Sequence, residues 1–231
     1  MALPNATTEW FFDGLNKCLE YLGALPIIAK SDNMKQWVSK SDRYSPTMSE
    51  ASQEWANYYG IGITACRFRH PRDKGPVESA VNQAYRYVYS RIQEDTFATI
   101  DKLNLRLWEL LDEYNSKPYK GSTRWDIFNN EEKPAMEPLP NIMYRFRYRK
   151  TVKLGPSYHV CVGKERHFYS VPHIYVSQKV TVMWDVRYVE VYSGNELVCT
   201  HERRFEICGY TTKEEHMPES HKAWTRIREL N

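Results

Sequence analysis

The spacing of apolar positions changes along the chain, from a period near 3.6 residues in the first part to a period of two in the last third. The longer period indicates helices with one buried face, and the shorter period indicates half-buried strands. We therefore predict a helical first part, with Val81 and Tyr85 on the core-facing side of the third helix, and an all-β last part. The predicted helices cover residues 7–22, 47–59, 76–92 and 100–114.

Two short apolar runs interrupt the helical part and predict buried parallel strands, Leu25–Ala29 and Ile61–Cys66. Asp32 follows the first run closely, and Glu78 lies in the first turn of the helix after the second run. In open α/β sheets, sites are built at the carboxyl ends of the strands. The sequence therefore offers Asp32 and Glu78 as two acids at one edge of a sheet.

Each acid has a structural and a functional interpretation. Asp32 and Asn33 follow a strand, where Asp and Asn commonly form turns or cap helices. Glu78 lies where the helix dipole favours a negative charge. Two carboxylates at a sheet edge can also hold divalent ions for phosphoryl transfer, since Mg²⁺ prefers oxygen ligands. Spacing alone leaves both interpretations open.

Polar and basic residues beside the acids, and at the start of the last part, are candidate DNA contacts. Cations there can neutralise backbone phosphates. A solvated loop, or the outward-facing side of a half-buried strand, accounts for them equally well. The candidates are Asn33 and Lys35 beside Asp32, Arg67, Arg69, Arg72 and Lys74 in the loop before Glu78, and Arg145, Arg147 and Arg149 in an alternating aromatic and basic run.

Three prolines in Glu131–Pro140 indicate a linker between the two parts. Beyond it, short strands separated by turns predict a small β-barrel, with a hairpin turn at Ser193-Gly194-Asn195. The predicted organisation is helices around a short, mainly parallel sheet in residues 1–130, a proline-rich linker in 131–141, a small β-barrel in 142–209 and a C-terminal tail in 210–231.

Composition narrows the class of protein. A net charge of +3 over 231 residues is mild, but residues 142–209 hold eleven Lys and Arg against six Asp and Glu, which favours a basic module. The five cysteines are scattered without zinc-knuckle spacing, as expected of free thiols in a reducing cytoplasm. No apolar run of about eighteen residues predicts a membrane span, and the start does not resemble a secretory signal.

Short motifs extend over nearly the whole chain. They are Gly23-Ala24-Leu25-Pro26, Asp32-Asn33-Met34-Lys35, Asp42-Arg43-Tyr44, the run from His70 to Glu78, Tyr169-Ser170-Val171-Pro172, Tyr210-Thr211-Thr212 and His216-Met217-Pro218. In these motifs and their order the chain resembles the IstA-type insertion-sequence transposases. That family belongs to the DDE recombinases, which have a ribonuclease H-like core and are related more distantly to Mu transposase and retroviral integrases.

The resemblance implies a fold and an activity. The expected fold is an α/β partial ribonuclease H-like core in residues 1–130, followed by the small all-β barrel found behind the core in Mu-like transposases. The resemblance implies that Asp32 is the second catalytic Asp and Glu78 the catalytic Glu, ligands of Mg²⁺ or Mn²⁺, with two ions in the complete site. It implies DNA cleavage and strand transfer.

The resemblance also implies partners and a location. The expected partners are double-stranded DNA, as element ends and as target, further copies of the chain in a homo-oligomer, and an AAA+ ATPase helper. The expected location is the bacterial cytoplasm, at the nucleoid, with no membrane partner.

One departure from the family limits these expectations. The family's first catalytic Asp precedes the first helix, at which this chain begins, and Asp13 has helical spacing and cannot replace it. We therefore expect a fragment that lacks the N-terminal part, is inactive alone and has another copy or a rearranged segment covering the edge of Leu25–Ala29. Two alternatives stay open: a non-catalytic DNA-binding or transpososome-assembly module, and a ribonuclease H-like nuclease.

Overall fold

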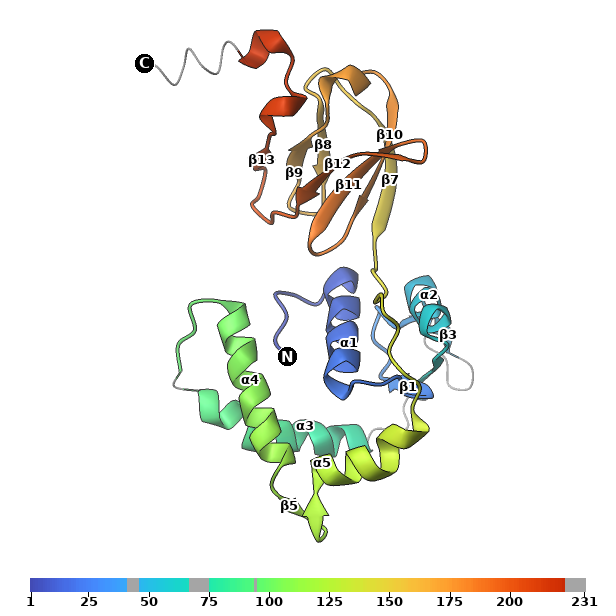
Figure 1. Ribbon diagram of the computed structural model, residues 1–231, viewed down its shortest axis with the longest axis vertical. Helices are drawn as coiled ribbons and strands as arrows, with labels where there is room; N and C mark the ends of the chain where they lie inside the picture. The colour runs from blue at the N-terminus through green and yellow to red at the C-terminus, as the bar shows by residue number, and fades with distance from the viewer. Residues whose placement is uncertain (41–45, 67–74, 94, 223–231) are drawn as a thin grey trace. The chain divides into compact units, whose positions relative to one another are not determined.

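The chain divides into two compact units, Met1–Phe146 and Arg147–Asn231 (Figure 1). The computed structural model describes residues 1–40, 46–66, 75–93 and 95–222. Each unit has a hydrophobic core of its own, so each is described by itself. Among the described residues, no helix combines the length and the apolar character that crossing a membrane requires.

The first unit is mainly helical, with short strands between the helices. The helices are α1 (Thr8–Leu22), α2 (Glu50–Tyr59), α3 (Gly75–Tyr87), α4 (Ile100–Asn115) and α5 (Arg124–Ile127), with single turns η2 (Tyr89–Ile92), η3 (Phe128–Glu132) and η4 (Lys133–Ala135). The strands are β1 (Ile28–Ser31), β2 (Val38–Lys40), β3 (Thr47–Met48), β4 (Gly62–Ala65), β5 (Pro118–Tyr119) and β6 (Ser122–Thr123). The helical turns η3 and η4 include residues 131–135, at the start of the segment predicted as a linker.

β1 and β4 form a two-stranded parallel sheet. The predicted strand Leu25–Ala29 is displaced, because the backbone of Leu25 is bonded elsewhere. Leu25 N donates to Glu137 O at 2.7 Å, and Glu137 N donates to Leu25 O at 3.1 Å. This isolated antiparallel bridge joins residues far apart in sequence, so the parallel strand begins only at Ile28.

The second helix also begins later than predicted. Thr47 and Met48 form β3, which pairs with β2, and α2 starts after Ser49. The Ser49 side chain accepts a hydrogen bond from Ser52 N at 3.1 Å and so caps the helix. At the other end, Gly60 adopts a φ of 68°, in the left-handed region that glycine enters without strain.

The core of the first unit is aromatic and includes one buried amide. Phe12 and Trp55 pack with ring centroids 6.5 Å apart, and both side chains are almost fully buried. Asn16 Oδ1 accepts from Trp55 Nε1 at 3.1 Å and from the Tyr59 hydroxyl at 2.9 Å, and Asn16 Nδ2 donates to Tyr144 O at 2.6 Å. Asn16 therefore ties α1 and α2 to the segment after α5.

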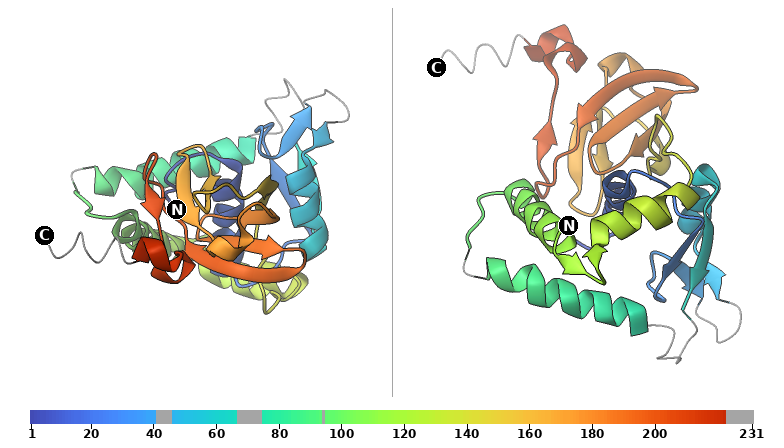
Figure 2. Two further views of the ribbon diagram at one scale, coloured as in Figure 1. Left: turned by 90° about the horizontal axis from the view of Figure 1, so that it is seen from above. Right: turned by 60° about the horizontal axis from the view of Figure 1, so that its bottom comes forward.

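The prediction that Val81 and Tyr85 face the core is wrong. Val81 is 47% exposed and Tyr85 is 63% exposed, whereas Val88 is buried against Leu107 and Leu110 of α4. The reason is that the packing against α4 involves the C-terminal end of α3 and the turn η2 that follows it. Helix α4 leads into the β5–β6 hairpin, and Figure 2 shows both beside α3.

The second unit is rich in β-strands, as predicted, and has two sheets. An antiparallel sheet has the strand order β12-β11-β10-β7, and a smaller sheet has the order β13-β9-β8. Alternate valines point into the core, and the predicted hairpin turn lies between Ser193 and Glu196, with Gly194 at a φ of 58°. The elements are β7 (Tyr148–Lys153), β8 (His159–Val162), β9 (His167–Ser170), η5 (His173–Tyr175), β10 (Lys179–Trp184), β11 (Tyr188–Ser193), β12 (Glu196–Glu202), β13 (Tyr210–Thr211) and η6 (Glu214–His216).

Candidate functional site

The carboxyl ends of β1 and β4 lie side by side, as the sequence predicted. Ser31 is opposite Ala65 in the parallel register, and Cys66 N donates to Ser31 O at 2.9 Å. Asp32 is the first residue beyond β1 and is exposed. The connection toward Glu78 leaves β4 at the same edge of the sheet. One acid thus lies at this edge, and the segment that leads to the other begins there.

A compact turn holds Asp32 beside β4. Its Oδ1 accepts from Asn33 N at 2.7 Å, and its backbone oxygen accepts from Met34 N at 2.8 Å. Asn33 Nδ2 donates to Cys66 O at 2.8 Å, and Trp37 Nε1 donates to Thr64 O at 3.0 Å. The side chains of Asn33 and Trp37 are therefore anchored on β4 and the residue after it, which fixes the backbone that follows Asp32. The pairing of Ser31 with β4 fixes the backbone that precedes it.

These contacts assign Asn33 a structural task that the sequence did not indicate. Its amide nitrogen is engaged by Cys66 O, so it joins the two strand ends. Lys35 is exposed and makes no ion pair with a described carboxylate. Of these two predicted DNA contacts, the side chain of Asn33 is engaged within the chain, whereas the ammonium group of Lys35 is open to a ligand.

Glu78 lies in the first turn of α3, as predicted, and is exposed. It makes no ion pair with a described cation, so no neighbour in the described part of the chain neutralises its carboxylate. The predicted loop contacts before it, Arg67, Arg69, Arg72 and Lys74, lie outside the described residues.

Asp32 and Glu78 are of the residue types that bind divalent ions such as Mg²⁺. Carboxylate oxygens are the ligands that Mg²⁺ and Mn²⁺ prefer, and both side chains are open to solvent. The described residues contain no group of three Asp, Glu, His or Cys side chains that includes Asp32 or Glu78. The chemistry of these two side chains therefore fits part of a magnesium site.

The predicted basic strand begins later than the sequence suggested. β7 starts at Tyr148, so Arg149 lies on a strand and Arg145 and Arg147 do not. The reason is packing before the strand: the ring of Phe146 stacks on Phe12 at 5.5 Å, which places this segment in the first unit. Arg147 Nη1 lies 3.1 Å from Glu190 Oε2 and is partly neutralised. Arg149 is exposed.

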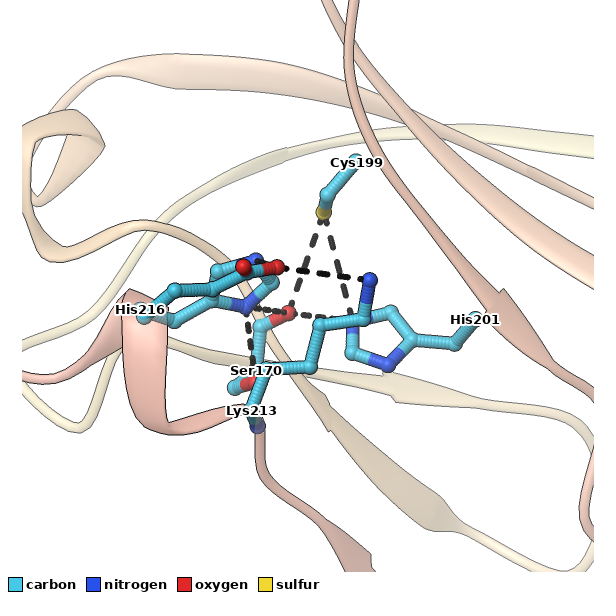
Figure 3. Close-up of polar contacts among 6 residues, drawn as sticks. Ser170, Cys199, His201, Lys213 and His216 are labelled. Carbon is cyan, nitrogen blue, oxygen red and sulfur yellow. Dashed lines mark hydrogen bonds and ion pairs between the residues drawn. The ribbon is translucent and has the colours of Figure 1, made fainter.

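The second unit contains a buried polar cluster that the sequence spacing did not indicate (Figure 3). Cys199 and His201 lie two residues apart on β12, and His216 lies on η6. One ligand atom of each lies within 4.8 Å of the others. Only the fold brings these residues together, since cysteine spacing alone predicted free thiols without a zinc site.

Ser170, at the end of β9, holds this cluster together. His201 Nε2 donates to Ser170 O at 2.6 Å, and His216 Nδ1 lies 2.8 Å from Ser170 Oγ. His216 Nδ1 also lies 3.0 Å from Ser170 O, and Lys213 N donates to Ser170 Oγ at 2.9 Å. Burial lowers the pKa of His201 to about 4 and raises the pKa of Cys199 to about 11. At neutral pH the cluster is therefore uncharged, and its hydrogen bonds connect β9, β12 and η6.

Comparison with known proteins gives both units relatives. Residues 139–212 match the family model described as Mu transposase, C-terminal domain. A protein of Sinorhizobium fredii named as a transposase is 33% identical over 225 residues, which are 96% of this chain and 43% of that protein. A protein of Burkholderia multivorans named as a transposase for insertion sequence IS408 is 34% identical over 228 residues, 96% of this chain and 43% of that protein.

Two further proteins are similar to this chain at lower sequence identity. The transposase for insertion sequence element IS21 of Pseudomonas aeruginosa is 23% identical over 234 residues, 99% of this chain and 58% of that protein. A solved structure of the simian T-cell lymphotropic virus intasome with PP2A regulatory subunit B56 gamma aligns at 14% identity and a TM-score of 0.43, over 84% of this chain and 62% of that chain. An overlap of this size does not define the fold.

The chain spans less than half the length of the first two relatives. The similarity to them nevertheless extends through both units, from the two-stranded sheet to the β-rich unit. The chain is thus similar over most of its length to proteins named as transposases, and residues 139–212 are similar to the C-terminal domain of Mu transposase.

Proposed function

We propose that this chain is part of an IstA-type DDE transposase and contributes two catalytic acids and a DNA-binding unit to it. The observation that carries the proposal is the parallel register of β1 and β4, which supports Asp32 as an acid at the sheet edge from which the chain runs to Glu78. The first unit would be the C-terminal portion of a ribonuclease H-like core, and the second the accessory barrel.

In this proposal Asp32 and Glu78 hold Mg²⁺ or Mn²⁺ through their carboxylate oxygens. Two such ions supply Lewis acidity to an in-line displacement at a phosphodiester. The residues of the chain orient the reaction: Asn33 fixes the turn that carries Asp32, and Lys35 contacts the DNA backbone. The reaction is hydrolysis at the element end, followed by attack of the freed 3′-hydroxyl on target DNA.

The proposed substrate is double-stranded DNA, and the proposed assembly is a homo-oligomer at the bacterial nucleoid that works with an AAA+ ATPase helper. Arg67, Arg69, Arg72 and Lys74 are proposed DNA contacts of the first unit, and Arg149 is proposed for the second. Arg145 and Arg147 precede β7 and are weaker candidates, because both lie outside the strand and Arg147 is also paired with Glu190.

The test is strand transfer with labelled element ends in Mg²⁺, by this chain and by the complete transposase. The chain alone should give no joined product, because two acids do not complete a two-ion site. In the complete protein, Asp32→Asn and Glu78→Gln should each lower joining by at least 100-fold. Glu50→Gln is the matched control, since Glu50 is an exposed first-turn acid of α2. Joining by the isolated chain, or full activity of Glu78→Gln, would contradict the proposal.

A second candidate function is a non-catalytic DNA-binding or assembly module. The observation that favours it is the match of residues 139–212 to a C-terminal domain, together with the basic character of that region. The same experiment separates the two functions. An assembly module would leave joining unchanged in Asp32→Asn and Glu78→Gln, while deletion of the second unit would abolish it.

A further inference from the structure

A cavity of about 730 Å³ lies between α3, the end of α4 and the start of the β5–β6 hairpin, within the first unit. Glu78 lines it, together with Asn82 and Arg86 further along α3. These three positions are spaced by four residues, so they follow one face of the helix. The cavity has the size of a small-ligand pocket and begins at the proposed catalytic glutamate.

Three cations line this cavity, Arg86, Lys117 and Arg124. Glu78 is the one acid among the described lining residues, so the lining carries an excess of two positive charges. None of the three cations makes an ion pair with a described carboxylate. Two other cations of this unit are paired, Arg91 with Glu113 and Arg106 with Glu109. The cavity therefore concentrates positive charge that no direct ion pair with a described carboxylate neutralises.

Tyrosine rings hold these cations in place. The guanidinium carbon of Arg124 lies 4.2 Å from the ring centroids of both Tyr114 and Tyr119. Arg86 and Lys117 lie over the ring of Tyr87, each 5.7 Å from its centroid. Cation–π contact orients a cation without consuming its N–H donors in a carboxylate pair. The donors of Arg124 are thus positioned and still available to an anion.

The same rings indicate which part of a nucleic acid would bind. Tyr87 and Tyr114 stack on each other with centroids 5.2 Å apart, and their remaining surfaces carry the cations. Ring faces that another ring or a cation already occupies are not available for stacking on a base. Guanidinium and ammonium groups instead match phosphate oxygens, which Arg can contact with two N–H donors at once.

We propose that this cavity binds phosphates of the DNA strand that enters the site at Glu78, with Arg124 as the central contact and Arg86 and Lys117 beside it. The inference rests on the proposed function and extends it, because it assigns a DNA-positioning site to the helices that follow the acids. Phosphate contacts of this kind set the register of a duplex without reading its sequence. The cavity would therefore align any duplex end with Glu78.

The experiment measures duplex DNA binding by the full chain, by fluorescence anisotropy at several salt concentrations. The test variant is Arg86→Gln, Lys117→Gln, Arg124→Gln combined. The matched control removes the same number of charges at ion-paired positions that are at least partly exposed: Lys17→Gln, Arg91→Gln, Arg106→Gln combined. Circular dichroism melts check that both variants are folded. Lys117→Gln alone provides a variant at an exposed position that leaves the Arg124 contacts in place.

We expect the test variant to weaken binding at least tenfold, and to lower the slope of log K against log salt by about one for each lost phosphate contact. The control should change affinity less than threefold. A single methylphosphonate near the duplex end should weaken binding to the unsubstituted chain and have no effect on the test variant. Inorganic phosphate at constant ionic strength should not displace the duplex, because one phosphate fills only part of the site.

Equal losses of DNA affinity in the test and control variants would overturn the inference. The net positive charge of the chain, and not this cavity, would then account for the binding. Unchanged binding in the test variant would overturn the inference as well. In either case strand transfer by the complete protein could still depend on Glu78, so the proposed function would stand. A chain that binds no duplex at low salt would contradict both.

Discussion

In each of the two polar sites of this protein, a single side chain joins separate elements through hydrogen bonds. Asn33 ties the turn after β1 to Cys66 O, and Ser170 receives two histidines from other elements. The motifs that contain Asp32-Asn33 and Tyr169-Ser170 were visible in the sequence, but their hydrogen-bond partners were not. Cys66 is 33 positions from Asn33 and His216 is 46 positions from Ser170, and no local pattern encodes contacts over such distances.

The buried histidines predict an acid-sensitive second unit. His201 has a pKa of about 4 in the folded chain, chiefly because burial disfavours its charged form, against an ordinary value of 6.5. Burial also lowers the pKa of His216, and Lys213 and Glu215 lie beside it. The unfolded chain therefore binds protons first, and stability is lost as pH falls from about 6.5 towards 4.

Urea unfolding at pH 7.0, 5.5 and 4.5, followed by far-ultraviolet circular dichroism, measures this loss. We expect His201 to contribute about 2 kcal/mol of destabilisation across this window. His201→Gln has no titrating group and can still donate to Ser170 O, so it should show a smaller pH dependence. An equal pH dependence in both proteins would exclude His201 as its source.

Whole elements were largely predictable where the signal is local. The helices α1 and α4 and the strand β4 lie within a few residues of their predicted bounds, because apolar period and bounding residues agree there. The failures have tertiary causes. Leu25 is engaged by Glu137, Phe146 packs on Phe12 before β7 begins, and α3 leaves Val81 and Tyr85 exposed because α4 contacts another part of it.

The end of α2 provides a prediction at this scale. Gly60 has a φ of 68° and donates its N–H to Ala56 O, and a Cβ added there would meet no atom within 4 Å. Gly60→Ala therefore tests backbone conformation without a clash, and should lower the free energy of unfolding by about 1 kcal/mol. Gly155→Ala is the control, because its backbone is not left-handed and its surroundings are also open. Chemical denaturation of the two variants should separate them.

At the scale of the whole molecule, the outer edge of β1 is unpaired among the described residues. β1 pairs only with β4 there, and Ile27 and Ile28 are 68% and 62% exposed. Unpaired backbone groups beside exposed isoleucines are a template for association. The expectation that another copy or another segment covers this edge stays a prediction, and the exposure of these side chains supports it.

Light scattering across a dilution series tests that expectation. The chain should show a mass that rises above the monomer at high concentration, and Ile28→Lys should shift the association to at least tenfold higher concentration. Ile207→Lys is the control, since Ile207 is even more exposed but lies in the second unit. A chain that stays monomeric over the whole series would show that this edge needs no cover from another copy.

The contacts of residues 144–146 with the core of the first unit determine where the chain can be divided into separate domains. The prolines suggest a boundary near residue 130, yet Tyr144 O receives the amide of Asn16 and Phe146 covers Phe12. A piece that ends at residue 130 would expose an aromatic core and leave a buried amide donor without its acceptor. The separable first unit therefore extends to Phe146, and dissection of this protein into expressible domains should begin between Phe146 and Arg147.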